Sequence, residues 1–341
     1  MTTIRSLMRG FGIAGLVLGL LAGAAAWVTG GEAPAARRPK AALLLSQGIN
    51  DAGFGAAGYL GLQALREKQG YETTLVENIP TPDLEAASRD FASRGWDVIF
   101  GHGFEFQDPF LRVAGDFPKT KFIVNKGAPR PSTPANLLIV DIKEHQPGYI
   151  LGVLAAHLTK SNKIGGIAGF DYGTIIRIME AYKAGARSVK PNIQIFITYA
   201  GTWTDPAKGK EAALAQIGQG ADVVFAHASV TSLGIFEAAR EKGVLAFGSV
   251  LDQNQVAPNT VVAGSLYDFP RMFLDVGGQV KDGTLKGGSV SFGMAEGVLD
   301  ITPLYGAANQ LSAAAKGQIE GLRRDIKAGK FTIQEVRKKS E

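Results

Sequence analysis

The segment KIGGIAGFDYGTIIRIMEAYKAGARSVKPNIQIFITY, residues 163–199, contains a complete strand–helix–strand unit. Short apolar runs at 163–169 and 193–199 flank an amphipathic stretch at 175–190, which stops before Pro191. Short apolar runs rich in β-branched residues are typical of strands that are buried on both faces of a parallel sheet. The segment therefore predicts one unit of a parallel sheet covered by helices.

The same alternation runs through most of the chain, from about residue 41 to about residue 330. Ten apolar runs are predicted strands: 41–46, 72–77, 97–101, 121–125, 136–141, 163–169, 193–199, 221–227, 244–249 and 260–265. Predicted helices lie between and after them: 60–69, 83–95, 147–160, 175–190, 207–220, 233–242, 270–281, and one or two more across 303–330. Because strands that alternate with helices form parallel sheets, two such series predict two α/β lobes.

The composition of the 341 residues excludes several kinds of chemistry. The chain has no cysteine, so disulfides, thiolate metal sites and cysteine nucleophiles are impossible. Its four histidines are far apart, and no phosphate-binding loop, nucleophile elbow or recognisable pair of carboxylates is present. The formal net charge of +5 comes from scattered residues, which argues against nucleic acid as a partner. We therefore expect a binding protein with no catalytic residues, no metal and no cofactor.

The first 36 residues have the composition of an export signal followed by a linker. Arg5 and Arg9 precede an uncharged apolar run at 11–28, and small residues follow, as in a secretory signal peptide. The same run is just long enough to span a membrane as an uncleaved anchor. Because the chain lacks cysteine, it cannot be a lipoprotein anchored at an N-terminal cysteine. We expect a periplasmic protein.

Ligands of open parallel sheets bind beyond the carboxyl ends of the strands, so the residues that follow each predicted strand are candidates for a site. Phe54, Phe104 and Trp203 could form apolar walls for a small planar ligand. The polar candidates that could orient it are Asn50, Asp51, Asn125, Asp171, His227, Ser229 and Asp252. Structural roles stay open for several of them, such as helix capping by Asp51 and packing beneath a loop by Phe54.

Several blocks in order resemble one family. They include INDAGFGAAGYLGLQAL at 49–65, GWDVIFGHGFEFQDPFLRVAGDFPKTKFIV at 95–124 and PGYILGVLAAHLTKSNKIGGIAGF at 147–170. Over roughly residues 41–330 the chain resembles the basic membrane protein family, substrate-binding proteins of ABC importers that include the purine nucleoside receptors. The resemblance implies the type I periplasmic binding fold, in which a hinge of three crossings joins two doubly wound parallel-sheet lobes. We expect a signal peptide and linker at 1–36, an N-terminal lobe at 37–142 plus about 264–300, a C-terminal lobe at 143–263 plus about 301–330, and a tail at 331–341.

The resemblance also implies roles for individual residues. Asp51 and Phe54 match an Asp and a Phe of the family's DDxSFN segment, in which the Phe stacks on the base. Asn125 stands where the family has an Asp that holds the base, and an amide can still pair with the edge of a heterocycle. Val250 and Asp268 stand where nucleoside receptors have an Asp and a Lys that bind ribose, so two ribose contacts are missing. A purine base or another planar heterocycle therefore fits this chain better than a nucleoside does.

The partners implied by the resemblance are a small-molecule ligand and an ABC permease in the inner membrane. We expect a monomer that delivers a purine-like ligand to that permease. An exported ligand sensor for a receptor kinase is an alternative, and an exported enzyme acting on a purine-like compound is a weaker one. A transcriptional regulator with the same lobes would need a helix-turn-helix where the export signal lies.

Overall fold

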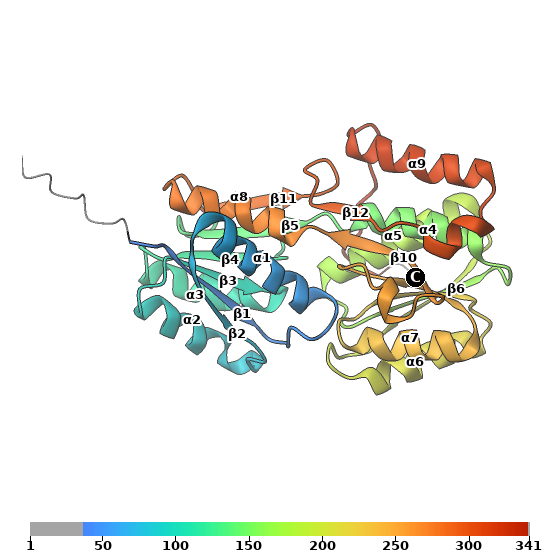
Figure 1. Cartoon of the computed structure of the whole chain (residues 1–341), viewed down its shortest axis with the longest axis horizontal. Helices are drawn as coiled ribbons and strands as arrows, with labels where there is room; N and C mark the ends of the chain where they lie inside the picture. Colours follow the sequence, from blue (N-terminus) through green and yellow to red (C-terminus); the bar gives the residue numbers. More distant parts are fainter. Residues whose placement is uncertain (1–36, 340–341) are drawn as a thin grey trace, which may run out of the picture. The chain divides into compact units, whose positions relative to one another are not determined.

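The computed structural model describes residues 37–339 and contains two six-stranded sheets that are flanked by helices (Figure 1). The first sheet has the strand order β11–β5–β4–β3–β1–β2 and is parallel throughout. Its strands are β1 (Lys40–Leu45), β2 (Glu72–Val76), β3 (Val98–His102), β4 (Lys121–Asn125), β5 (Leu137–Ile142) and β11 (Gly288–Phe292). Its helices are α1 (Phe54–Gln69), α2 (Leu84–Ser93), α3 (Gln107–Val113) and α8 (Phe269–Lys281).

The second sheet has the order β12–β10–β9–β8–β6–β7, and within it only β10 and β12 pair antiparallel. Its strands are β6 (Lys163–Ala168), β7 (Gln194–Tyr199), β8 (Val223–His227), β9 (Leu245–Gly248), β10 (Val261–Tyr267) and β12 (Leu299–Ile301). Its helices are α4 (His145–Leu158), α5 (Gly173–Val189), α6 (Pro206–Gly218), α7 (Thr231–Lys242) and α9 (Ala313–Lys327). The predicted class, two α/β lobes built on parallel sheets, is confirmed.

Alternating side chains of a strand point to opposite faces of its sheet, and β1 shows how both faces become buried. Ala41, Leu43 and Leu45 join the hydrophobic cluster that contains residues of α1 and α8. Ala42 and Leu44 join a separate cluster with residues of α2 and α3. All five side chains are fully buried, which explains why this strand is a continuous apolar run rather than an alternating one.

The structure adds three elements that the sequence pattern did not predict. Strand β11 is a partly exposed edge strand rich in Gly and Ser, and β12 is only three residues long, so neither has the apolar run of a buried strand. Helix α3 lies within the segment that follows β3. In addition, α1 begins at Phe54 instead of Leu60, although its first turns are rich in Gly. The Asp51 carboxylate makes this early start possible, because it accepts hydrogen bonds from the backbone N–H groups of Gly53, Gly55 and Ala56.

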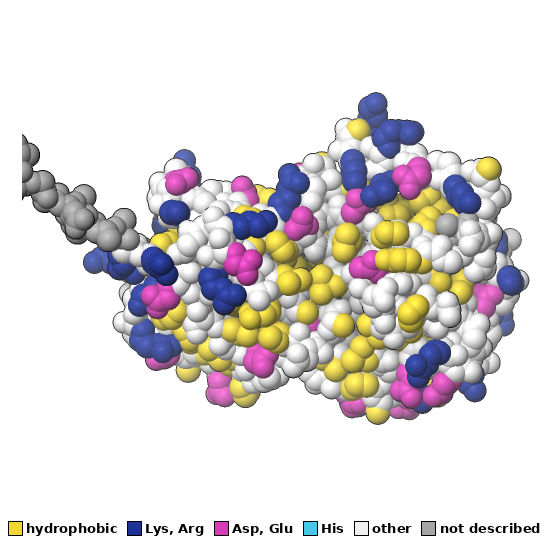
Figure 2. Space-filling view, in the orientation of Figure 1, with side chains coloured by type: hydrophobic (Ala, Val, Ile, Leu, Met, Phe, Trp, Pro, Cys, Tyr) yellow, Lys and Arg dark blue, Asp and Glu magenta, His cyan; other side chains and the backbone are white. Residues whose placement is uncertain are grey.

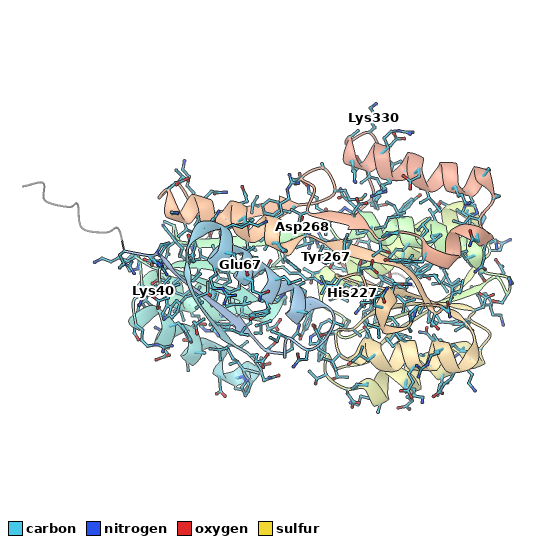
Figure 3. All side chains as sticks on the ribbon, in the orientation of Figure 1. Lys40, Glu67, His227, Tyr267, Asp268 and Lys330 are labelled. Carbon is cyan, nitrogen blue, oxygen red and sulfur yellow. The ribbon has the colours of Figure 1, made fainter. Side chains whose placement is uncertain are left out.

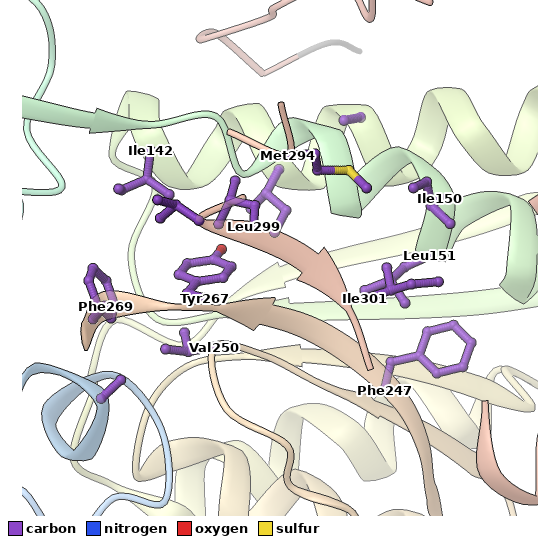
Figure 4. Close-up of a cluster of buried hydrophobic side chains, with 14 of the residues drawn as sticks. Ile142, Ile150, Leu151, Phe247, Val250, Tyr267, Phe269, Met294, Leu299 and Ile301 are labelled. Atoms are coloured by element: carbon purple, nitrogen blue, oxygen red, sulfur yellow. The ribbon is translucent and has the colours of Figure 1, made fainter. Parts of the chain in front are cut away.

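The chain passes between the sheets three times, after β5, after β10 and after β11. Ile142, Tyr267 and Leu299, one from each crossing, are buried in one hydrophobic cluster with residues of both lobes (Figure 4). Strand β10 continues to Tyr267, a few residues beyond the lobe boundary expected near 264, and β12 begins close to the boundary expected near 301. The division of the chain into lobes at these crossings remains our proposal.

Of the C-terminal tail expected at 331–341, the described residues 331–339 contact α4 and α5. The rings of Phe331 and Tyr149 lie 5.4 Å apart, and Ile333 is buried. Glu335 forms an ion pair with Arg177 of α5 at 2.9 Å. Residues 331–339 are therefore part of the folded lobe.

The expected signal peptide and linker at 1–36 lie outside the described residues. Within residues 37–339, none of the helices is long and apolar enough to cross a membrane. On the face shown in Figure 2, basic and acidic side chains are interspersed over the surface. This distribution agrees with the scattered charges expected from the sequence.

Candidate functional site

A cavity lies at the carboxyl ends of the strands, where residues of both lobes face each other. The first lobe contributes residues that follow β1, β3 and β4, and the second contributes residues that follow β6, β7, β8 and β9. The carboxyl ends of parallel strands lie at one edge of a sheet, so segments far apart in the sequence meet there. The cavity is thus located where the sequence analysis placed a ligand site.

Phe54, the first residue of α1, lines the cavity, and its ring packs against the ring of His102. The two rings are stacked with centroids 3.8 Å apart and an angle of 19° between their planes. Burial lowers the pKa of His102 to about 3, so its ring is neutral and carries one N–H. Since Nε2 lies 2.7 Å from the Phe54 carbonyl oxygen, Nε2 donates to it and Nδ1 accepts from Asn125 at 2.6 Å. Gly58 leaves room for this ring, because a Cβ there would lie 2.7 Å from Nε2.

The second lobe contributes an aromatic wall. Trp203 packs directly on Gly169, where a Cβ would lie only 2.1 Å from the indole ring. The rings of Phe170 and Tyr172 are stacked at 5.3 Å, and Phe170 is 5.4 Å from the ring of Trp203. Phe104 of the first lobe approaches Tyr172 at 5.5 Å, so aromatic contact extends across the cleft. Such walls suit a flat apolar ligand.

A buried ionic cluster lies beside Phe54 at the junction of the lobes. The ammonium of Lys126 is 2.8 Å from Glu144 Oε2 and 3.3 Å from His227 Nε2. The Tyr267 hydroxyl donates to the same Glu144 oxygen at 2.9 Å, and Figure 3 shows Tyr267 and His227 in the region where the lobes meet. Burial and the charge of Lys126 lower the pKa of His227 well below its ordinary value, so this ring is neutral too.

Glu105 adds a carboxyl group to the lining of the cavity. It accepts a hydrogen bond from the Ser46 hydroxyl. Burial raises its pKa, although the hydrogen bond and the charge of Lys126 act in the opposite direction. The Glu105 carboxyl group can therefore form a hydrogen bond with a ligand, and its burial disfavours the ionised form of that group.

Two further hydrogen bonds connect the lobes across the cleft. The Ser229 hydroxyl donates to the Asp51 carboxylate at 2.8 Å. The amide Nε2 of Gln253 donates to the carbonyl oxygen of Ala52 at 2.9 Å. Asp51 therefore has two structural roles. It connects the lobes through Ser229, and it accepts hydrogen bonds from N–H groups at the start of α1.

The structure brings together half of the residues selected from the sequence. The cavity is lined by Phe54, Phe104, Trp203, His227 and Ser229.

The other selected residues lie behind the cavity or away from it. Asp51 and Asn125 are buried and support the loop of Phe54. Asp171 is exposed, forms an ion pair with Lys339 at 2.7 Å and has a lowered pKa because of it. Asp252 is exposed and accepts a hydrogen bond from Tyr305, and Asn50 is exposed as well.

Sequence reasoning missed several residues that line the cavity. They are Gln47, Glu105, Lys126, Thr174, Ser249 and Gln253. Most of them stand one to five residues after the end of a strand, next to residues that were selected. A rule that selects every polar residue after each strand would have included most of them, but it would also have selected many residues that do not line the cavity. Within residues 37–339, no cluster of three or more His, Asp or Glu side chains could hold a metal ion.

Residues 38–335 match the model of a protein family, Bmp, described as ABC transporter substrate-binding protein PnrA-like. Among curated proteins, the ABC transporter nucleoside-binding protein BmpA of Lactococcus lactis is 28% identical over 317 residues, which cover 86% of this chain and 88% of BmpA. A purine-binding protein of Brucella abortus is 30% identical over 243 residues, which cover 71% of this chain and 67% of that protein.

Solved structures show the same fold. A solute-binding protein of an ABC transporter system from Aeropyrum pernix superposes with a TM-score of 0.78 at 23% identity, covering 87% of this chain and 94% of that one. A second solute-binding protein, from Conexibacter woesei, superposes with a TM-score of 0.69 at 22% identity, covering 87% of this chain and 99% of that one. The predicted two-lobed binding-protein fold is confirmed.

Proposed function

Because the chain belongs to the Bmp family of PnrA-like ABC transporter substrate-binding proteins, we propose that it captures a purine base or a related planar heterocycle between its lobes and delivers it to a permease. The observation that carries this proposal is the cavity between the two sheets, with Phe54 on one side and the aromatic wall of Trp203 on the other. Stacking of a base on an aromatic ring contributes about 1–3 kcal/mol per base. The names of the Lactococcus and Brucella relatives, which refer to nucleosides and purines, support the same class of ligand.

Two positions favour a base over a nucleoside. Val250, where the resemblance places a ribose-binding Asp, is a buried apolar residue that lines the cavity. Asp268, where it places a ribose-binding Lys, is exposed and caps α8 by accepting a hydrogen bond from the Arg271 N–H at 3.0 Å. Ribose hydroxyls that lose partners on binding cost about 1–3 kcal/mol each.

The proposal includes the cellular setting. The protein is exported to the periplasm, acts as a monomer and meets the permease of an ABC importer in the inner membrane. It releases its ligand unchanged, because transport requires closure and opening of the lobes but no chemistry on the ligand.

A thermal-shift screen tests this proposal. We expect purine bases to raise the melting temperature of the purified protein more than nucleosides, flavins or sugars do. A ligand present at 100 times its dissociation constant adds about 2.7 kcal/mol to the free energy of unfolding. Chromatography of the recovered ligand should show the starting compound. Stabilisation by sugars alone, or conversion of the ligand, would contradict the proposal.

A further inference from the structure

Lys126 is a buried basic residue that lines the cavity. It follows the last residue of β4 and has a φ of 73°, in the left-handed region that residues with a Cβ rarely adopt. Its side chain is only 9% exposed, and its ammonium lies 5.3 Å from the centre of the Phe54 ring. The ammonium is over the ring, so a ligand that contacts Phe54 would lie close to this ammonium.

One N–H group of the Lys126 ammonium is available to donate a hydrogen bond to a ligand. Glu144 and His227 each accept one of its three N–H groups, and no other acceptor contacts it among residues 37–339. Glu144 also balances its charge, so the cluster as a whole does not call for an anionic ligand. The remaining N–H needs an uncharged acceptor, such as a carbonyl oxygen or a ring nitrogen.

His227 provides a second donor beside the first. Its Nε2 accepts from Lys126, so the single proton of the neutral ring is on Nδ1. Nδ1 is buried and has no hydrogen-bond partner among the described residues. Lys126 and His227, which both line the cavity, thus each keep one N–H group without an acceptor among the described residues.

Purines differ in the edge that they can present to two donors. A 6-oxopurine carries adjacent acceptors at O6 and N7, whereas a 6-aminopurine carries an acceptor at N7 beside an amino donor. The amide of Gln47, which also lines the cavity, has a donor and an acceptor and can pair with either edge. Gln47 therefore does not discriminate between the two kinds of purine, whereas Lys126 and His227, as donors, can.

We propose that Lys126, with His227 beside it, makes the cavity selective for 6-oxopurines over 6-aminopurines. This inference rests on the proposed function and specifies the class of ligand. The exocyclic amino group of a 6-aminopurine would leave one of these donors unpaired in a buried site, whereas O6 and N7 of a 6-oxopurine would satisfy both.

Isothermal titration calorimetry with hypoxanthine and adenine tests the inference, because the two bases differ at position 6. We expect the native protein to bind hypoxanthine at least about tenfold more tightly than adenine. The double variant Lys126→Met/Glu144→Gln, which removes both charges together, should lose most of this preference. Lys126→Arg keeps a cationic donor and should retain it.

Lys121→Met is the matched control, since Lys121 is a partly exposed lysine at the other end of β4, and it should bind both bases as the native protein does. Circular dichroism and the melting temperature verify that each variant is folded. Equal or tighter binding of adenine by the native protein, or an unchanged preference in the folded double variant, overturns the inference and leaves the proposed function intact. Failure of both bases to bind, in a protein that the thermal-shift screen shows to be stabilised by sugars alone, overturns the proposed function itself.

Discussion

The Arg177→Met substitution is expected to lower the free energy of unfolding by about 3–5 kcal/mol. Arg177 of α5 is only 1% exposed. Its two terminal nitrogens lie 2.8 and 3.2 Å from the two carboxylate oxygens of Asp141, in a paired arrangement. The same guanidinium donates to the Ile142 carbonyl oxygen and to Glu335. It therefore connects α5, the first crossing between the lobes and the C-terminal residues.

The size of the expected effect follows from the charge that is left behind. Asp141 is 2% exposed, so without Arg177 its carboxylate would remain buried with the Ser291 hydroxyl at 3.1 Å and the guanidinium of Arg337 at 3.6 Å. A buried charge that loses its main partner is costly, whereas removal of both partners is often nearly neutral. Denaturant unfolding measures the loss, and the double variant Arg177→Met/Asp141→Asn should recover a large part of it.

Arg323→Met serves as the control for charge removal at a more exposed site. Arg323 pairs with Asp300 at 2.6 Å, but its side chain is 33% exposed, and Lys327 also contacts that carboxylate. Ion pairs in contact with solvent contribute about 0–1 kcal/mol, so this variant should unfold almost like the native protein. Equal stability of the Arg177 and Arg323 variants would show that the buried pair does not stabilise the crossing.

The Phe54→Ala substitution is expected to weaken ligand binding by about 1–3 kcal/mol, which corresponds to a roughly fivefold to 150-fold higher dissociation constant. The ring of Phe54 is held in place before any ligand arrives, because it is stacked on His102 and lies edge-on to Phe269 at 5.6 Å. A pre-positioned ring loses little side-chain entropy on binding, so most of its stacking energy goes into affinity. Calorimetry with the best ligand of the thermal-shift screen measures the change.

Two further variants separate stacking from general damage to α1. Phe54→Leu keeps an apolar side chain without a flat face and should recover only part of the affinity. Leu60→Ala changes an exposed residue of the same helix, 43% accessible, and should leave affinity unchanged. If Phe54→Ala binds the ligand as the native protein does while remaining folded, Phe54 does not belong to the site.

The amino-acid sequence by itself determined the strand–helix alternation and the edge of the sheets where the cavity lies. Apolar runs such as 41–46 can be recognised in the sequence because burial of both faces of the strand produces an uninterrupted apolar run. Phe54 and Trp203 were identifiable because large aromatic residues stand out among the small polar residues that follow a strand. The sequence did not predict edge strand β11, because its side chains are partly exposed and do not form an apolar run.

Only the tertiary structure decided which of the residues at the strand ends face the cavity. Asn125 and Lys126 are neighbours in the sequence, yet Asn125 contacts His102 and Lys126, whose φ is 73°, lines the cavity. Lys126 then meets Glu144 and His227, which lie 18 and 101 residues further along the chain. The direction of a side chain depends on local dihedral angles, and the residues that it contacts depend on how the two lobes pack. Neither the dihedral angles nor the packing produces a periodic pattern in the sequence, which is the physical reason.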